Sequence, residues 1–275
     1  MRKTAGDTVR YVVAAARAEL TKIVTLRAVW LVTGAVAALQ VFVLAQNVAA
    51  ETEAVSRITA DGMIERFPGV VRPAREALVE HLAASSFQMC VFLPCVAALI
   101  AGQEFRAGQL GTSLLAVPRR GLLVGAKALA AGVFLLSVSV VIAAISTAFV
   151  YAAVEEWDPG LPVSTEAWTA QAKVLAYAVL SGLTIFAVTL IARSALTGVL
   201  VTVALTALTM SQVLAVSAPA LDALVPLSAG RNLVLAPGEG LRLSAGPGHA
   251  LAVLAAWPLL ATAAAALVLG RRDAR

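Results

Sequence analysis

Six stretches of this 275-residue chain contain no Asp, Glu, His, Lys or Arg, and each is long enough to cross a lipid bilayer. Each stretch has between 19 and 28 uncharged positions, and a helix needs about 20 residues to cross a hydrocarbon core about 30 Å thick. We therefore predict an all-α integral membrane protein in which the whole chain is one transmembrane domain. The six expected spans are about residues 28–50, 82–102, 128–152, 174–192, 195–216 and 250–270.

The composition agrees with this interpretation. Apolar residues make up 60% of the chain, charged residues make up 13%, and the mean hydropathy is +0.88. A soluble domain contains about 25% charged residues. The composition thus excludes a disordered chain, a disulfide scaffold and an ordinary soluble enzyme.

Arg193 divides the longest apolar region. As a single helix, residues 174–221 would be about 70 Å long at 1.5 Å per residue, which is twice the membrane thickness. We therefore expect a tight turn at Arg193 between two antiparallel spans.

The basic residues are unevenly distributed between the two predicted membrane faces. The face that carries both termini has 14 Lys and Arg residues, and the opposite face has 7. The positive-inside rule then predicts a plasma-membrane protein with both termini in the cytoplasm. The net charge of +5 is thereby explained without a nucleic-acid partner.

Residues 8–26 are expected to form an amphipathic helix in the plane of the lipid head groups. At 100° per residue, its apolar side chains fall on one face: Val9, Val12, Val13, Ala16, Leu20, Ile23 and Val24. The alternative is a simple N-terminal extension of the first span. Basic residues are expected to anchor the chain at lipid phosphates, namely Arg10, Arg17, Lys22, Arg27 and Lys127.

Two regions outside the spans are distinctive. Residues 51–81 are polar, with turn signals at Asp61-Gly62 and around Pro68. Residues 217–249 are apolar but rich in Pro and Gly, which predicts short re-entrant helices on the outer side. Pro94, inside the second span, predicts a kink.

Residues that carry common membrane chemistry are missing from the expected spans. None of the six contains Asp, Glu or His, and the chain has neither an HExxH motif nor a P-loop. Cys90 and Cys95 have no His or acidic neighbour, which favours ordinary packing. We expect no catalytic residue, no metal site, no cofactor bound by this chain and no enzymatic activity of its own.

The segment between the second and third spans reads GQEFRAGQLGTSLLAVPRRGLLVGAK, residues 102–127. It resembles the membrane subunits of ABC-2-type exporters, which carry Glu-aromatic-Arg-x-Gly, then Leu-Leu, Pro, Arg-Arg and a Lys seven residues later. Gln109 stands where that family more often has Thr. The resemblance is more general over the amphipathic start, the six spans and the broken apolar segment.

In that family this segment is a coupling helix, here expected over residues 103–116, which docks into a cleft of an ATP-binding subunit. A carboxylate at position 104 suits a helix N-terminus. The resemblance assigns ATPase coupling to Glu104, Phe105, Arg106, Gln109, Leu110, Thr112, Leu114, Leu115, Pro118, Arg119 and Arg120. The alternative is an interfacial loop whose basic residues only set the topology.

The implied assembly contains two ABC ATPase subunits, which bind ATP and Mg, and a second permease subunit that is identical or homologous. The expected role is export of an amphipathic or hydrophobic substrate, such as a drug, an antimicrobial peptide or a lipid-like molecule. One alternative is a bacteriocin or lantibiotic immunity module of the same architecture, in which residues 51–81 contact the peptide. The other is a membrane enzyme or structural protein unrelated to ABC transporters.

Overall fold

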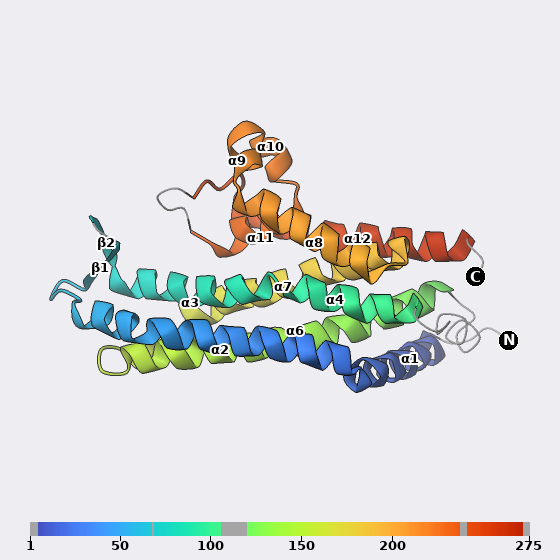
Figure 1. Cartoon of the computed structure of the whole chain (residues 1–275), viewed down its shortest axis with the longest axis horizontal. Helices are drawn as coiled ribbons and strands as arrows, with labels where there is room; N and C mark the ends of the chain where they lie inside the picture. The colour runs from blue at the N-terminus through green and yellow to red at the C-terminus, as the bar shows by residue number, and fades with distance from the viewer. Residues whose placement is uncertain (1–4, 68, 106–119, 237–240, 272–275) are drawn as a thin grey trace.

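The chain folds into an elongated bundle of helices (Figure 1). This computed structural model describes residues 5–67, 69–105, 120–236 and 241–271. Both termini lie at one end of the bundle, called here the terminus end, and a small β-hairpin lies at the other, called the hairpin end. The all-α prediction is confirmed, apart from this hairpin.

Among the described residues, five helical segments are long and apolar enough to cross a membrane. Four of these segments contain the expected spans 28–50, 128–152, 174–192 and 250–270. The remaining segment is a longer rod whose second half is the expected span 82–102. The segments are α2 (Arg27–Ser56), α3 (Ala74–Cys90) continued by α4 (Leu93–Gly102), α6 (Arg120–Val154), α7 (Thr165–Ala192) and α12 (Pro247–Arg271). The chain is therefore a multi-pass helical membrane protein by length and hydropathy.

The rod formed by α3 and α4 is interrupted at Val91 and Phe92. Pro94 has no backbone N–H to donate to the carbonyl of residue 90, and its ring crowds that carbonyl. The break in the helix lies just before Pro94, at the place where the sequence predicts a kink.

The predicted turn at Arg193 is also confirmed. Arg193 ends α7 in the left-handed conformation, with φ of 55°, and Ser194 caps the next helix by accepting a hydrogen bond from the Thr197 backbone N–H. A left-handed residue is a common way to end a helix. Helices α7 and α8 (Ala195–Met210) are therefore separate and joined by a tight turn, as expected.

The predicted fifth span, residues 195–216, is wrong in its length. Helix α8 ends at Met210 after 16 residues, which is about 24 Å. The backbone then leaves the helix, because Gln212 adopts a left-handed conformation with φ of 53°. The sequence remains apolar past this point, but the helix ends.

The described part of the breaker-rich segment 217–249 contains short helices, as predicted, namely α10 (Pro219–Asp222) and α11 (Pro226–Val234). Another short helix, α9 (Val213–Ser217), precedes them at the end of the expected span 195–216. Helices α9 and α10 project sideways from the bundle (Figure 1). Their position in the outer leaflet stays a prediction.

The polar stretch between the first two long helices folds into a hairpin that the sequence did not suggest. Strands β1 (Met63–Phe67) and β2 (Val70–Pro73) pair antiparallel. Gly62 and Gly69 have φ of 72° and 82°, so the predicted turns lie at the start and at the tip of this hairpin. A 3-10 turn, η2 (Leu161–Val163), closes the other loop at this end.

Helix α1 (Ala5–Thr25) is separate from α2, because Leu26 between them is extended. This break favours the amphipathic helix over a simple extension of the first span. Ala16 and Ile23 are buried, and α1 packs against α6. Trp30 donates a 2.7 Å hydrogen bond from its indole nitrogen to the Val24 carbonyl, which holds the bend.

A layer of polar side chains crosses the interior of the bundle. Gln40 of α2 donates to Ser146 Oγ of α6 at 2.6 Å and lies 3.4 Å from the Ser85 carbonyl of α3. Gln171 of α7 donates to Ser86 Oγ at 3.0 Å. Because hydrogen bonds of this kind join helices inside a membrane, the layer sets the register of four helices.

Candidate functional site at the terminus end

A buried ionic cluster joins three elements at the terminus end. Lys127 Nζ of α6 lies 2.7 Å from Glu19 Oε2 of α1 and 2.6 Å from Glu104 Oε1. Glu104 belongs to η1 (Gln103–Phe105), the 3-10 turn that continues α4. Lys22 Nζ lies 2.8 Å from Glu19 Oε1 and completes the cluster. One ammonium group therefore links α1, α4 and α6.

The three central side chains are largely removed from solvent, with exposures of 5% for Lys127, 10% for Glu19 and 9% for Glu104. Glu104 Oε2 is buried and makes no hydrogen bond to any described residue. Removing one partner of a buried ion pair leaves an uncompensated charge and costs about 3–5 kcal/mol. Movement of any one of these elements is therefore resisted by the other two.

A small pocket opens beside this cluster. It is lined by the charged residues together with Gln103 and apolar side chains from three helices, Ile23 of α1, Ile100 of α4 and Phe186 of α7, and from Leu26 between α1 and α2. The pocket lies where the described chain leaves α4, next to the segment that resembles a coupling helix.

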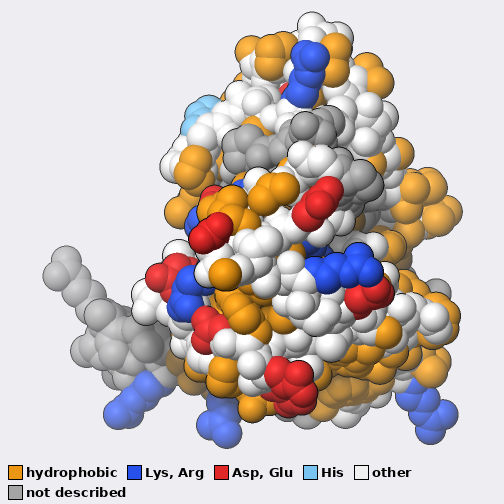
Figure 2. Space-filling model, turned by 90° about the vertical axis from the view of Figure 1, so that its left-hand side faces the viewer, with side chains coloured by type: hydrophobic (Ala, Val, Ile, Leu, Met, Phe, Trp, Pro, Cys, Tyr) orange, Lys and Arg blue, Asp and Glu red, His pale blue; other side chains and the backbone are white. Residues whose placement is uncertain are grey.

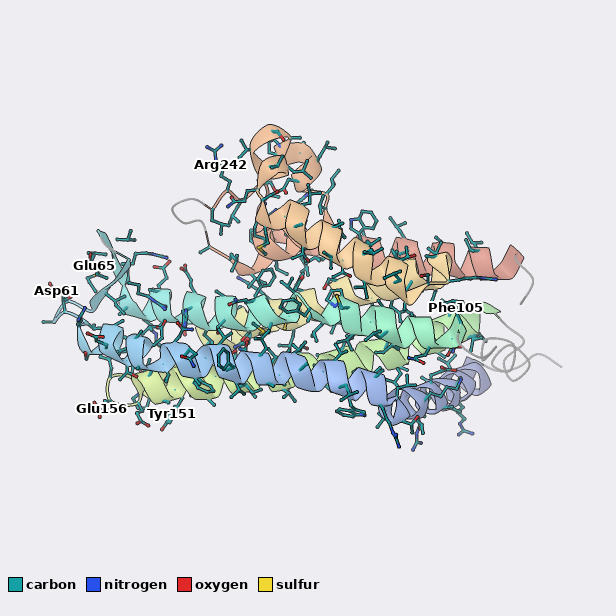
Figure 3. All side chains as sticks on the ribbon, viewed as in Figure 1. Asp61, Glu65, Phe105, Tyr151, Glu156 and Arg242 are labelled. Carbon is teal, nitrogen blue, oxygen red and sulfur yellow. The ribbon has the colours of Figure 1, made fainter. Side chains whose placement is uncertain are left out.

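The coupling helix expected over residues 103–116 is described only at its start. Residues 103–105 form the 3-10 turn that directly follows α4, so Glu104 lies next to the C-terminus of that helix. That position disfavours a carboxylate, and Lys127 supplies the compensating charge. Phe105 lies half-buried at the terminus end (Figure 3).

The remaining predicted coupling residues lie outside the described part of the chain: Arg106, Gln109, Leu110, Thr112, Leu114, Leu115, Pro118 and Arg119. Arg120 is the first residue of α6. The structure brings together the two ends of the resembling segment, Glu104 and Lys127, and adds Glu19 from α1.

Four of the five predicted interfacial anchors are exposed, namely Arg10, Arg17, Lys22 and Arg27. Lys127 differs from the expectation, because it is buried and bound to two carboxylates instead of extending to lipid phosphate. Glu19 was not singled out by the sequence. Its position near the apolar arc of α1 was the available signal, since a carboxylate there must meet a cation on the neighbouring helix.

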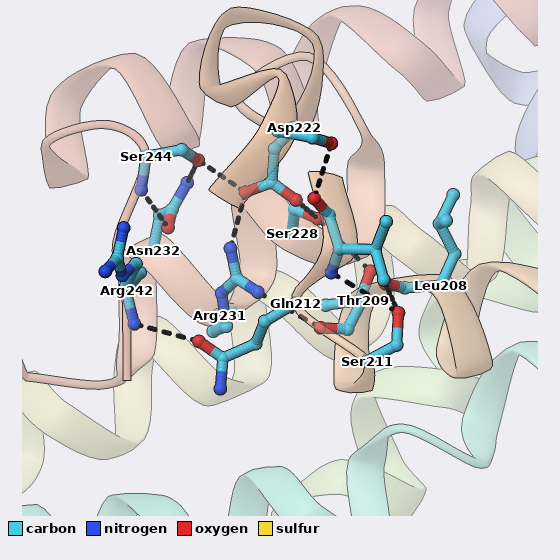
Figure 4. Close-up of polar contacts among 12 residues, drawn as sticks. Leu208, Thr209, Ser211, Gln212, Asp222, Ser228, Arg231, Asn232, Arg242 and Ser244 are labelled. Atoms are coloured by element: carbon cyan, nitrogen blue, oxygen red, sulfur yellow. Dashed lines mark hydrogen bonds and ion pairs between the residues drawn. The ribbon is translucent and has the colours of Figure 1, made fainter. Parts of the chain in front are cut away.

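A second buried ion pair lies in the segment after α8 (Figure 4). Arg231 Nη2 lies 2.5 Å from Asp222 Oδ2, with side-chain exposures of 2% and 1%. Asp222 also accepts hydrogen bonds from Ser228 at 2.7 Å and Ser244 at 2.6 Å, and Arg231 donates to the Thr209 carbonyl at 3.1 Å. The network ties α8, α10, α11 and the chain before α12 together.

Ion pairs also connect the elements at the hairpin end. Arg72 of β2 donates to both carboxylate oxygens of Glu80, at 2.6 and 2.9 Å, and Arg75 lies 2.6 Å from Asp158 in the α6–α7 loop. Arg66 of β1 pairs with Glu51 of α2. Burial lowers the pKa of Arg66 from its ordinary value, and the adjacent Glu51 carboxylate partly offsets this effect. Figure 2 shows cationic and anionic side chains side by side on this end.

No protein-family model matches the sequence, and a comparison with curated proteins gives no match.

Proposed function

We propose that the chain is the membrane-spanning permease subunit of an ABC-2-type ATP-binding cassette exporter. A separate ATPase subunit, present in two copies, supplies the energy by binding ATP and Mg, and a second permease subunit completes the assembly. The substrate is amphipathic or hydrophobic. The terminus end then faces the cytoplasm and the hairpin end faces the outside of the plasma membrane.

The observation that carries this proposal is the sequence of residues 102–127, together with what the structure builds at its two ends. Glu104 and Lys127 flank the segment and meet in the buried cluster with Glu19. A force applied to the segment by a docked ATPase would reach α4 and α6 directly and α1 through Lys127. A segment that transmits movement from an ATPase to a helical bundle requires such connections to several helices.

The first test asks whether a Walker-type ATPase is encoded beside the gene and co-purifies with the chain, and it is followed by measurement of ATP turnover in nanodiscs. Arg106→Ala should lower the ATP turnover of the complex, because it removes a charge from the docking segment. Arg57→Ala is the matched control, since Arg57 is exposed at the opposite end of the bundle. Glu104→Ala is less informative, because it also breaks the buried ion pair.

Two outcomes would contradict the proposal: failure of any ATPase to co-purify, or equal turnover in Arg106→Ala and wild type. Topology is tested separately with a membrane-impermeant thiol reagent on intact cells. Thr59→Cys, at the hairpin end, should react at once, whereas Gln109→Cys should react after permeabilisation. The reverse pattern would place the proposed docking segment outside the cell.

A further inference from the structure

Helix α1 presents one face to the bundle and another face away from it. Ala16, Glu19 and Ile23 are buried and lie three and four residues apart, so they form the face that packs on the bundle. Val13 and Val24 are 48% and 46% exposed and lie on an adjoining edge of the helix. The apolar arc of α1 is therefore wider than the part that the bundle covers.

Two arginines border this exposed edge. Positions 10, 13, 17 and 24 are separated by three, four and seven residues, and residues at such spacings are neighbours along one side of a helix. Arg10 and Arg17 are exposed there, and neither forms an ion pair with a carboxylate of the described residues. The outer edge, defined here as Arg10, Val13, Arg17 and Val24, thus combines apolar surface with two guanidinium groups.

The outer edge continues onto α2 across the bend between the two helices. Trp30, which is 50% exposed, donates its indole N–H to the Val24 carbonyl and so joins the two surfaces. Arg27 and Leu31, one turn apart, are both exposed. Phe42 is exposed three turns beyond Leu31 on the same side of α2. Because α2 is long and apolar enough to cross a membrane, we expect acyl chains beside this side and head groups at Arg27.

The basic residues at this end fall into two groups. Lys22 and Lys127 are engaged by Glu19, at 2.8 and 2.7 Å. The exposed arginines of α1 and of the first turn of α2 have no carboxylate partner among the described residues. A guanidinium group donates two parallel hydrogen bonds to a phosphate, and each basic residue near an anionic leaflet strengthens binding about fivefold. The exposed arginines therefore favour lipids with a net negative charge.

We propose that the outer edge and the adjoining side of α2 bind anionic phospholipid in preference to zwitterionic phospholipid. Arg10, Arg17 and Arg27 hold the phosphate groups, and acyl chains run beside Leu31 towards Phe42. The lipid then holds α1 from outside, while the buried cluster holds its inner face. The inference goes beyond the proposed export function, because it requires neither the ATPase nor nucleotide. It also goes beyond general anchoring at the membrane surface, because it requires selection between lipids.

The probe is quenching of Trp30 fluorescence by phospholipids brominated in their acyl chains. A variant with Trp157→Phe, Trp168→Phe and Trp257→Phe keeps Trp30 as its single tryptophan. It is reconstituted into bilayers of phosphatidylcholine and phosphatidylglycerol in which one or the other lipid is brominated, and the two quenching curves give a relative binding constant. We expect a preference of at least about fivefold for phosphatidylglycerol at low salt, and this preference should fall as NaCl is raised.

Arg17→Gln combined with Arg27→Gln in this background should bring the relative binding constant to within about twofold of one. Arg57→Gln combined with Arg242→Gln is the matched control, because it also removes two exposed arginines. Arg57 lies at the hairpin end, and Arg242 lies between α11 and α12, away from α1 (Figure 3). The control should keep the relative binding constant within about twofold of its starting value.

Three results would overturn the proposal: equal quenching by the two lipids, a preference that NaCl does not change, or the same preference in both double variants. The salt titration needs no change to any arginine, so it tests the proposal even where a variant folds poorly. A failure of ATPase coupling would leave all of these measurements unaffected.

Discussion

Gly102, the last residue of α4, allows α4 and α8 to approach closely. A Cβ atom added at Gly102 would lie 2.3 Å from Ala195 Cβ and 3.0 Å from Ala195 Cα. Gly198, further along α8, shows the same closeness, because its added Cβ would lie 2.8 Å from Ala98 Cβ. Small residues on both helices thus form one tight seam next to the buried cluster at Glu104, as is common between membrane helices.

Gly102→Ala should force this seam open. Carbon atoms in contact prefer about 3.5–4.0 Å, so the helices must separate locally by about 1.2 Å. Ala195 has no alternative rotamer that would avoid the clash. Overpacking costs about 1–3 kcal/mol, and replacing Gly near a helix end returns about 0.5 kcal/mol. We expect the free energy of unfolding to fall by about 0.5–2.5 kcal/mol.

The assay is unfolding by SDS titrated into dodecyl maltoside micelles and followed by far-UV circular dichroism. Gly125→Ala in α6 is the matched control, because an added Cβ there meets no atom within 4 Å. It should be neutral or more stable by up to about 1 kcal/mol. Gly102→Ala combined with Ala195→Gly should recover part of the loss, because the 2.3 Å contact between the two Cβ atoms is removed while the 3.0 Å contact with the Cα of residue 195 remains. Wild-type stability for Gly102→Ala, or no recovery in the double variant, would refute the reasoning.

Three further variants can be compared in the same unfolding assay. Lys127→Ala should lower the free energy of unfolding by about 3–5 kcal/mol, since it leaves two buried carboxylates without their shared cation; a loss below about 1 kcal/mol would contradict this. Asp222→Asn should cost a similar amount because Arg231 stays buried and charged, and a neutral result would show that water reaches Arg231. Gln40→Leu should cost about 0.5–1.5 kcal/mol through loss of the bond to Ser146, and stabilisation would argue against a role in helix register.

The long helices were predictable from the chain alone, because a charge in hydrocarbon is costly and its absence over about 20 residues is a strong signal. The turn at Arg193 followed from the same reasoning and from the length limit of a single span. Helix ends were less predictable. Helix α8 stops at Met210 although the apolar run continues, because Gln212 adopts a left-handed backbone conformation. That conformation leaves no signal in the hydropathy of the sequence.

The buried charges were predicted least well. Lys127 was expected at lipid phosphate, since its partner Glu19 lies 108 residues away in the chain and no local pattern links them. Asp222 and Arg231 are close in sequence, but a Pro-led helix start separates them. Two opposite charges within an otherwise apolar, breaker-rich segment were the available signal, because charges in such a setting are stable when paired.

The position of the termini explains why the segment after α8 needs this pair. Both termini lie at the same end (Figure 1), so the chain must pass along the bundle an even number of times. The five long helical segments provide an odd number, and α8 must supply the return although it covers about 24 Å of a core about 30 Å thick. Residues 211–236 follow α8, and their short helices leave many backbone groups without intrahelical partners. Arg231 donates to the Thr209 carbonyl in the last turn of α8, and Asp222 accepts hydrogen bonds from the Ser228 and Ser244 hydroxyl groups within the same network. The network therefore supplies a side-chain donor to a carbonyl at the point where no further helical turn follows, and it joins α8 to the short helices after it.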